Sequence, residues 1–338
     1  MNQAIPGPGW HPDPGGTPQF RYWDGTAWTE HLAPFGPGDG PPIPPSRAAR
    51  GSGVIVAVVA GIVVIALLGS VIAVALGSDN KTPKAKGPAT ARSIVSTVVT
   101  IPAHVFSDVG IGSAGPLPTK LPGPVRTKNG KPRILYMGSE YCPFCATERW
   151  AMVAALSRFG TFTNVGITRS AGFPEVYPST PTFTFHGSTY KSAYITFEGV
   201  EMKSNQPDAS GSGYAIRDIP TPEQRALMGK YDAPPFTDGS IGGIPFIDFA
   251  DSYLISGSTY SPQVLQGKSF DEIANAMTDS STAVSHGAIG SANLITAAIC
   301  ALTRDQPANV CADETIQTLE GELRAESPPG VSSGQSSG

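Results

Sequence analysis

The apolar run at residues 54–76 constrains the chain more than any other segment. It reads VIVAVVAGIVVIALLGSVIAVAL, and no charged residue occurs between Gly51 and Ser78. At about 1.5 Å per residue, a helix of this length spans roughly 34 Å, which exceeds the roughly 30 Å of a bilayer's hydrocarbon core. We therefore predict one transmembrane helix at 54–76. A cleaved signal peptide and a buried core helix are the alternatives.

The charges beside this run leave its orientation open. Arg47 and Arg50 precede it, whereas four basic residues follow it between Lys81 and Arg92. A simple count of positive charges places the C-terminal side in the cytoplasm, although large domains cross membranes largely regardless of such charges. We favour an extracytoplasmic C-terminal side, because all four Cys follow residue 140 and suit an oxidising compartment. The expected location is the cell membrane, with a single pass.

Composition divides the rest of the chain. The net charge is −4 and only 15% of residues are charged, which argues against a nucleic-acid binder. Asp24-Gly25 between two aromatic segments predicts a small β-hairpin module. The expected parts are a Trp-rich hairpin module at 6–34, a Pro/Gly linker at 35–50, a stalk and domain lead-in at 78–130, a globular domain at 131–326 and a disordered tail at 327–338.

Patterning within 131–326 predicts an α/β domain. The first expected elements are a buried strand at 134–137, a helix at 143–159 with Gly160 as its C-cap, and a strand at 162–167. A hairpin within 182–197 that turns at 186–188 follows, and then a helix that starts with a capping box at Thr221. The last are paired strands at 243–249 and 253–256, a helix that starts with a capping box at Ser269, a helix that ends near Thr303 and another after Cys311.

The segment Cys142-Pro143-Phe144-Cys145 carries the chemistry. It follows the first predicted strand and begins a helix, where free backbone N–H groups and the helix dipole stabilise a thiolate. Pro143 suits the first helical position, where no N–H is needed. Cys142 is therefore the predicted nucleophile, and Cys145, one turn on, is the predicted resolving thiol. Glu140 should raise the pKa of a Cys142 thiolate and the helix start should lower it, and the sequence does not decide between them.

Ile244-Pro245 begins a later strand and is the predicted substrate-binding segment. A cis proline there would expose the neighbouring backbone to an extended peptide. The sequence does not show which isomer is present.

Two other interpretations of the cysteine pair stay open. The pair could be half of a zinc site, with Cys300, Cys311 or a histidine as further ligands, or it could be a purely structural bridge. We predict a second disulfide between Cys300 and Cys311 across a helix–turn–helix, with a redox relay as the alternative role. We expect no metal and no cofactor.

These motifs resemble the thioredoxin superfamily, and more closely an uncharacterised family of membrane-anchored thioredoxin-like proteins. The resemblance covers roughly residues 95–325 and rests on the segments at 140–146, 148–150, 156–160 and 243–249. It implies a thioredoxin-like domain with a long insert and C-terminal helices, with Cys142 and Cys145 as the active pair and Pro245 as the cis proline. Tyr141 stands where thioredoxin has Trp, and the 169–241 region is longer than a minimal thioredoxin fold needs. The amino-acid sequence of the N-terminal module resembles that of a short bacterial module of unknown function.

Two functions follow as expectations. The first is a membrane-tethered thiol–disulfide oxidoreductase that acts on extracytoplasmic protein thiols or disulfides. By analogy, a quinone-linked membrane thiol oxidase would recycle it. The second is a non-catalytic membrane adaptor whose cysteine pairs are structural. Accessibility and reactivity of Cys142 would separate the two.

Overall fold

The computed structural model describes residues 9–12, 19–23, 28–34, 90–172, 175–237 and 243–329, which fall into two separate units. The predicted membrane span, the 35–50 linker and residues 330–338 of the tail lie outside the described residues. The first unit is an antiparallel sheet of β1 (Gly9–Pro12), β2 (Gln19–Trp23) and β3 (Trp28–Pro34), in which Trp23 lies opposite Trp28. The predicted turn at Asp24-Gly25 lies outside the described residues.

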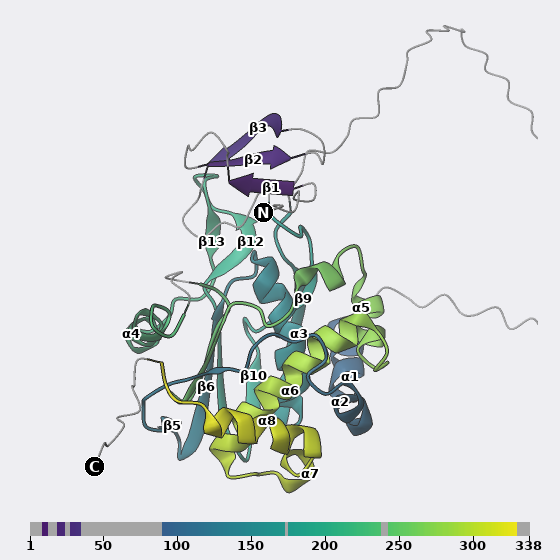
Figure 1. The fold of residues 1–338 in the computed structure, drawn as a ribbon, viewed down its shortest axis with the longest axis vertical. Helices are drawn as coiled ribbons and strands as arrows, with labels where there is room; N and C mark the ends of the chain where they lie inside the picture. Colours follow the sequence, from purple (N-terminus) through teal and green to yellow (C-terminus); the bar gives the residue numbers. More distant parts are fainter. Residues whose placement is uncertain are drawn as a thin grey trace, which may run out of the picture. The chain divides into compact units, whose positions relative to one another are not determined.

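The second unit is a mixed α/β domain with C-terminal helices (Figure 1). Its helices are α1 (Ala91–Val99), α2 (Ala103–Val109), α3 (Pro143–Ser157), α4 (Pro222–Tyr231), the 3-10 helix η1 (Pro262–Leu265), α5 (Phe270–Ala276), α6 (Ala283–Thr303), α7 (Ala308–Cys311) and α8 (Glu314–Ala325). Its strands are β4 (Thr119–Lys120), β5 (Thr127–Lys128), β6 (Lys131–Gly138), β7 (Gly160–Thr163), β8 (Gly166–Arg169), β9 (Pro181–Thr184), β10 (Thr189–Ser192), β11 (Thr196–Glu201), β12 (Lys203–Pro207), β13 (Tyr214–Ile216), β14 (Phe246–Phe249) and β15 (Tyr253–Ser256).

The main sheet is mixed, in the order β11-β6-β14-β15-β4, and β5 also pairs with β6. β11 runs parallel to β6, whereas the other pairs are antiparallel. A parallel pair needs a crossover connection, and α3 lies on the crossover from β6 to β11. The chain that leaves the carboxyl end of β6 therefore enters α3, most of whose residues are buried in the domain core.

Side chains alternate between the two faces of β6, and each face has its own core. Ile134 and Tyr136 belong to the larger cluster, with residues of α3 and α6, whereas Leu135 and Met137 pack with Leu227 and other residues on the α4 side. The lead-in joins the larger cluster, because Ile94, Val98 and Phe106 of α1 and α2 are buried in it. The 90–130 segment is thus packed onto the domain.

α6 is the described helix that is long and apolar enough to cross a membrane. It lies inside the domain, however, with nearly every residue from Val284 to Cys300 buried. α6 packs on α3 and α8, so it serves as a core helix of this unit. It therefore gives no support for a membrane location, and the predicted span at 54–76 stays a prediction.

Several predicted elements are confirmed. The buried strand lies within β6, and the strands around Asp251 are β14 and β15, which pair through a turn with Ala250 and Asp251 at positive φ. Thr221 and Ser269 each form the predicted capping box. In each box a side-chain oxygen satisfies a helix-start N–H, which explains why α4 and α5 begin there.

Three local predictions are wrong. The helix at 143–159 ends at Ser157 with Arg158 as its C-cap, and Gly160 begins β7. The single strand at 162–167 is two strands, because Asn164 adopts φ 60° and turns the chain between β7 and β8. The hairpin within 182–197 does not form: its turn at 186–188 is present, but β9 pairs with β8 and β10 pairs with β7. The strand that pairs in parallel with β6 is β11.

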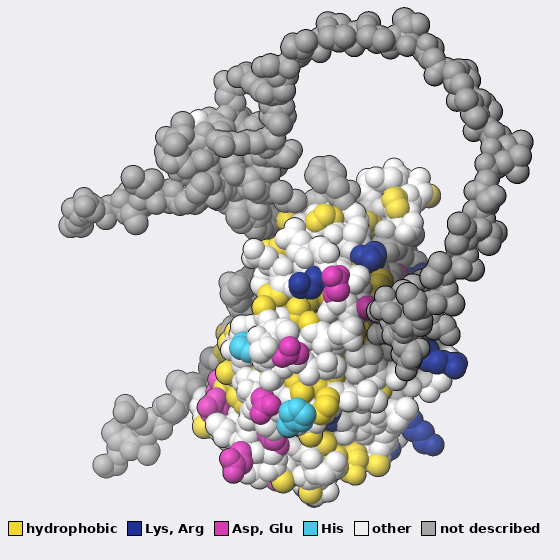
Figure 2. Space-filling model, turned by 90° about the vertical axis from the view of Figure 1, so that its right-hand side faces the viewer, with side chains coloured by type: hydrophobic (Ala, Val, Ile, Leu, Met, Phe, Trp, Pro, Cys, Tyr) yellow, Lys and Arg dark blue, Asp and Glu magenta, His cyan; other side chains and the backbone are white. Residues whose placement is uncertain are grey.

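The described surface is chemically mixed on the face shown in Figure 2. Hydrophobic side chains occur there in small groups between polar ones, and acidic side chains gather toward the lower half. The large hydrophobic side chains of this domain are mostly inside, with Ile216 and Ile219 among the exceptions.

Candidate functional site

The cysteine pair lies where the central strand passes into α3. Cys142 is the N-cap of α3 and Pro143 occupies its first turn. The backbone N–H of Cys145 donates to Sγ of Cys142 at 3.3 Å, so the sulfur takes the place of the usual capping oxygen. Both cysteines are free thiols. The local sequence thus places the Cys142 sulfur where it accepts a hydrogen bond from an N–H group of the first helical turn.

The predicted substrate-binding segment meets this pair. The thiol of Cys142 donates to the carbonyl oxygen of Ile244 at 3.8 Å, and the Ile244–Pro245 peptide bond is cis. The structure therefore brings Cys142, Cys145, Ile244 and Pro245 together from two segments about one hundred residues apart, since the contact spans 102 positions.

The pKa values of the two thiols are shifted in opposite directions. The hydrogen bond with Cys145 lowers the pKa of Cys142, and the helix-start N–H groups and the charge of Arg149 lower it further against the effect of burial. Burial raises the pKa of Cys145 well above that of an ordinary thiol, and the hydrogen bond with Cys142 adds to this. Cys142 is 5% exposed and Cys145 is fully buried. Cys142 is thus suited to attack a substrate, and Cys145 is suited to resolve the mixed disulfide afterwards.

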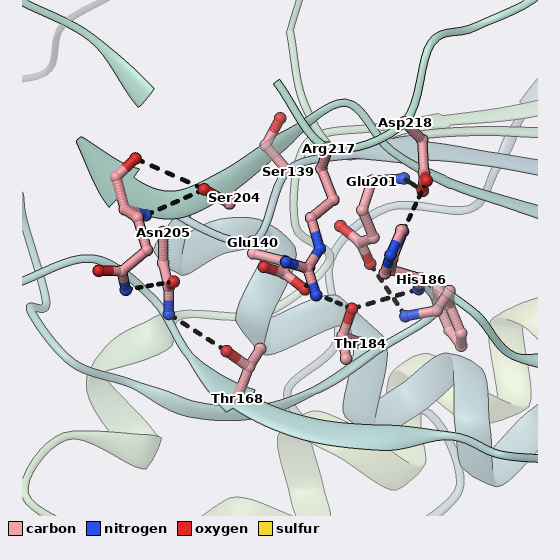
Figure 3. A network of polar contacts seen from close by, with 12 residues as sticks. Ser139, Glu140, Thr168, Thr184, His186, Glu201, Ser204, Asn205, Arg217 and Asp218 are labelled. Carbon is pink, nitrogen blue, oxygen red and sulfur yellow. Dashed lines mark hydrogen bonds and ion pairs between the residues drawn. The ribbon is translucent and has the colours of Figure 1, made fainter. Parts of the chain in front are cut away.

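Glu140 does not reverse this balance. Its Oε1 accepts a hydrogen bond from the Thr184 hydroxyl at 2.6 Å and lies 3.4 Å from Nε of Arg217. Figure 3 shows it within a polar network contributed by several segments of the domain. In the same network Nδ1 of His186 lies 2.6 Å from Asp218, which also accepts the backbone N–H of Glu201. The net shift in the pKa of Cys142 is downward, mainly through the hydrogen bond with Cys145, and Glu140 is not among the main influences on it.

A buried ion pair under the cysteines was not predicted from the sequence. Arg149 and Glu201 are both fully buried, and Nε of Arg149 lies 2.9 Å from Oε1 of Glu201. The signal for Arg149 is a charged residue one turn after Cys145, beside Glu148, in a helix with no other charged residue. Nothing in the spacing identifies Glu201, which lies 52 positions away on β11.

Aromatic contacts involve the residues on either side of Cys142-Pro143 in the sequence. The rings of Tyr141 and Tyr214 stack with centroids 4.2 Å apart, and Phe144 meets Tyr177 edge to face at 6.3 Å. Phe144 is 38% exposed. Tyr177 and Tyr214 belong to the region between α3 and α4, so this long connection contacts Tyr141 and Phe144 beside the cysteine pair.

Cys300 and Cys311 form a disulfide between the end of α6 and α7. Both are fully buried, whereas Cys142 faces the Ile244 carbonyl, so the bridge is set within the core. Within residues 90–172, 175–237 and 243–329, and the short first unit, no group of three or more His, Cys, Asp or Glu side chains could hold a metal ion.

Two family models match parts of this chain. Residues 123–217 match a domain of unknown function, DUF929, which includes β6, α3 and the cysteine pair. Residues 8–41 match a protein of unknown function, DUF2510, which includes the N-terminal unit. No curated protein and no solved structure matches the chain. The comparisons thus assign the cysteine pair to a DUF929 domain and name no activity.

Proposed function

We propose that the chain is a thiol–disulfide oxidoreductase with a thioredoxin-like domain. The observation that carries this proposal is the asymmetric pair at the start of α3, with the Cys142 thiol against the cis Ile244–Pro245 bond. A lowered pKa at Cys142 increases the thiolate fraction of the attacking cysteine, and the raised pKa of Cys145 favours the protonated form of the resolving thiol.

The arrangement of the domain supports the same assignment. Strand, helix, parallel strand, helix and two antiparallel strands follow one another as β6, α3, β11, α4, β14 and β15. This is the order that the resemblance to thioredoxin implies, with the β7–β10 region inserted before β11. Fold alone does not define an activity, so the proposal rests on the cysteine site.

The substrates we propose are protein thiols or disulfides outside the cytoplasm, reached from a membrane tether at 54–76. A quinone-linked membrane thiol oxidase is the proposed recycling partner. The near-complete burial of Cys142, 5% exposed, is the observation that favours the second candidate, an adaptor with a structural bridge.

Redox titration of the protein in glutathione buffers, with trapping of each cysteine by mass spectrometry, separates these functions. A midpoint for Cys142–Cys145 between about −120 and −230 mV supports exchange activity. A pair that stays oxidised below about −300 mV, with Cys142 never trapped alone, would establish the adaptor instead.

A further inference from the structure

Arg149 lies directly beneath the cysteine pair. It follows Cys145 by one helical turn, and residues at this spacing share a face of the helix. Its Nη2 donates to the carbonyl oxygen of Ser139 at 2.7 Å, and the N–H of Cys142 donates to the same oxygen at 3.3 Å. The guanidinium is therefore tied to the turn that carries the nucleophile.

The guanidinium is held rigidly on its other sides. Nε donates to the Tyr136 hydroxyl at 3.0 Å, and Nη1 donates to the carbonyl oxygen of Phe183 at 3.1 Å. Glu201 accepts from Nη2 at 3.1 Å. Because the whole group is excluded from water, its charge is weakly screened and acts strongly on nearby ionisable groups.

The charged and titratable groups around Arg149 come from three elements. Tyr136 lies on β6, Glu201 lies on β11, and the two cysteines lie at the start of α3. Glu140, beside the pair, acts on Glu201 and is itself close to Arg217. The Arg149 charge acts to lower the pKa of both cysteines, and Glu201, its ion-pair partner, offsets part of that charge.

We infer that Arg149 is a positioning residue whose buried charge stabilises the Cys142 thiolate of the reduced pair and makes the oxidised pair a disulfide donor to protein dithiols. This inference rests on the proposed function. A thiolate exists only after reduction, so a cation that stabilises it stabilises the reduced state and strengthens the oxidised pair as an oxidant.

The exchange balances without another reactant. One substrate thiolate attacks Sγ of Cys142, which breaks the Cys142–Cys145 bond and releases the Cys145 thiolate, which takes up a proton. The second substrate thiolate then attacks the mixed disulfide at the substrate sulfur. The substrate leaves as a disulfide, having lost two electrons, and the pair leaves as a Cys142 thiolate and a Cys145 thiol.

The test compares two variants of the full chain in detergent, by the pH profile of iodoacetamide alkylation at Cys142. Glu201→Gln removes the charge that neutralises Arg149, so its profile should shift to lower pH than that of the unmodified protein. The double variant Arg149→Met/Glu201→Gln removes both charges without leaving an orphaned ion. Relative to Glu201→Gln, its alkylation rate at pH 6 should fall about tenfold, which corresponds to one pKa unit.

The glutathione equilibrium should move in the same sense, about tenfold toward the disulfide in the double variant relative to Glu201→Gln. The variant Arg149→Lys/Glu201→Gln keeps the charge, so it should restore most of the difference between Glu201→Gln and the double variant. Arg158→Gln, at the C-cap of the same helix, is the matched control and should leave the profile unchanged. General damage to the site would instead move Glu201→Gln and the double variant in the same direction.

Equal profiles in the two variants, or a shift of Glu201→Gln to higher pH, would overturn the role of Arg149. If the double variant does not fold by near-UV circular dichroism, the direction of the Glu201→Gln shift decides alone. Failure of the unmodified protein to oxidise a dithiol peptide would refute the proposed function, whereas the alkylation profiles would still decide the role of Arg149.

Discussion

The two cysteines of the pair are chemically unequal, and substitution should separate them. Cys142 caps the helix and has the lowered pKa, whereas Cys145 is fully buried. We expect Cys142→Ser to abolish exchange with a disulfide peptide. Cys145→Ser should accumulate a mixed disulfide at Cys142, because no resolving thiol remains. Intact mass spectrometry after mixing with a disulfide peptide measures both; an adduct on neither variant contradicts the assigned roles.

The residues of this site differ in how well their roles could be predicted from the sequence. The roles of Cys142, Pro143 and Cys145 could be predicted from the local sequence. A strand followed by a helix start is recognisable within about twenty residues, and it determines the capping geometry. Ile244 and Pro245 could be associated with them from the proline at a strand start and from the family resemblance, but not from the spacing alone. Arg149 and Glu201 could not be paired at all, because ion pairing across 52 positions depends on which strand lies beside β6.

At the scale of elements, that choice of strand is where sequence reasoning failed. The segments β7, β8, β9 and β10 have the alternation of strands, yet they form two-stranded pairs outside the main sheet. β11 takes the place beside β6, with Phe197 opposite Ile134. Alternation predicts that a segment is extended, but it does not specify the partner, which is settled by competition between several similar strands.

The bridge between α6 and α7 should stabilise the domain without taking part in exchange. Its ends are 11 positions apart, which in the loop-entropy model corresponds to about 3 kcal/mol. We expect Cys300→Ala/Cys311→Ala to lower the free energy of unfolding by that amount, as measured by urea denaturation, with the glutathione midpoint of Cys142–Cys145 unchanged. A shifted midpoint would favour the relay role for this bridge.

Strand β14 carries a buried acid that should make stability depend on pH. Burial raises the pKa of Asp248 to about 7, and Asp251 adds to this while Arg133 opposes it. The folded state thus binds the proton more tightly than the unfolded chain does. The stability from this carboxyl is fully present below about pH 4 and is lost as pH rises to about 7.

Asp248→Asn cannot ionise, so it should gain stability relative to the unmodified protein between these pH values. The expected gain is on the order of 4 kcal/mol, from a shift of about three pKa units. Urea denaturation at pH 4 and pH 8 measures it, with the exposed Asp108→Asn as the control. A difference in stability between Asp248→Asn and the unmodified protein that is the same at both pH values would contradict the prediction.

For the whole molecule, the compartment of the domain decides what the cysteine site can do. Disulfides persist outside the cytoplasm and are rare within it, so the buried Cys300–Cys311 bridge favours the proposed extracytoplasmic location of the domain. We expect acid-trapped cells to contain this bridge oxidised in the full chain and reduced in a variant that lacks residues 54–76. Peptide mass spectrometry after alkylation measures both states, and deletion of residues 6–34 is the control that retains the predicted span. A reduced bridge in the full chain would place the domain in the cytoplasm, where an oxidising Cys142–Cys145 pair would find few stable disulfides to make.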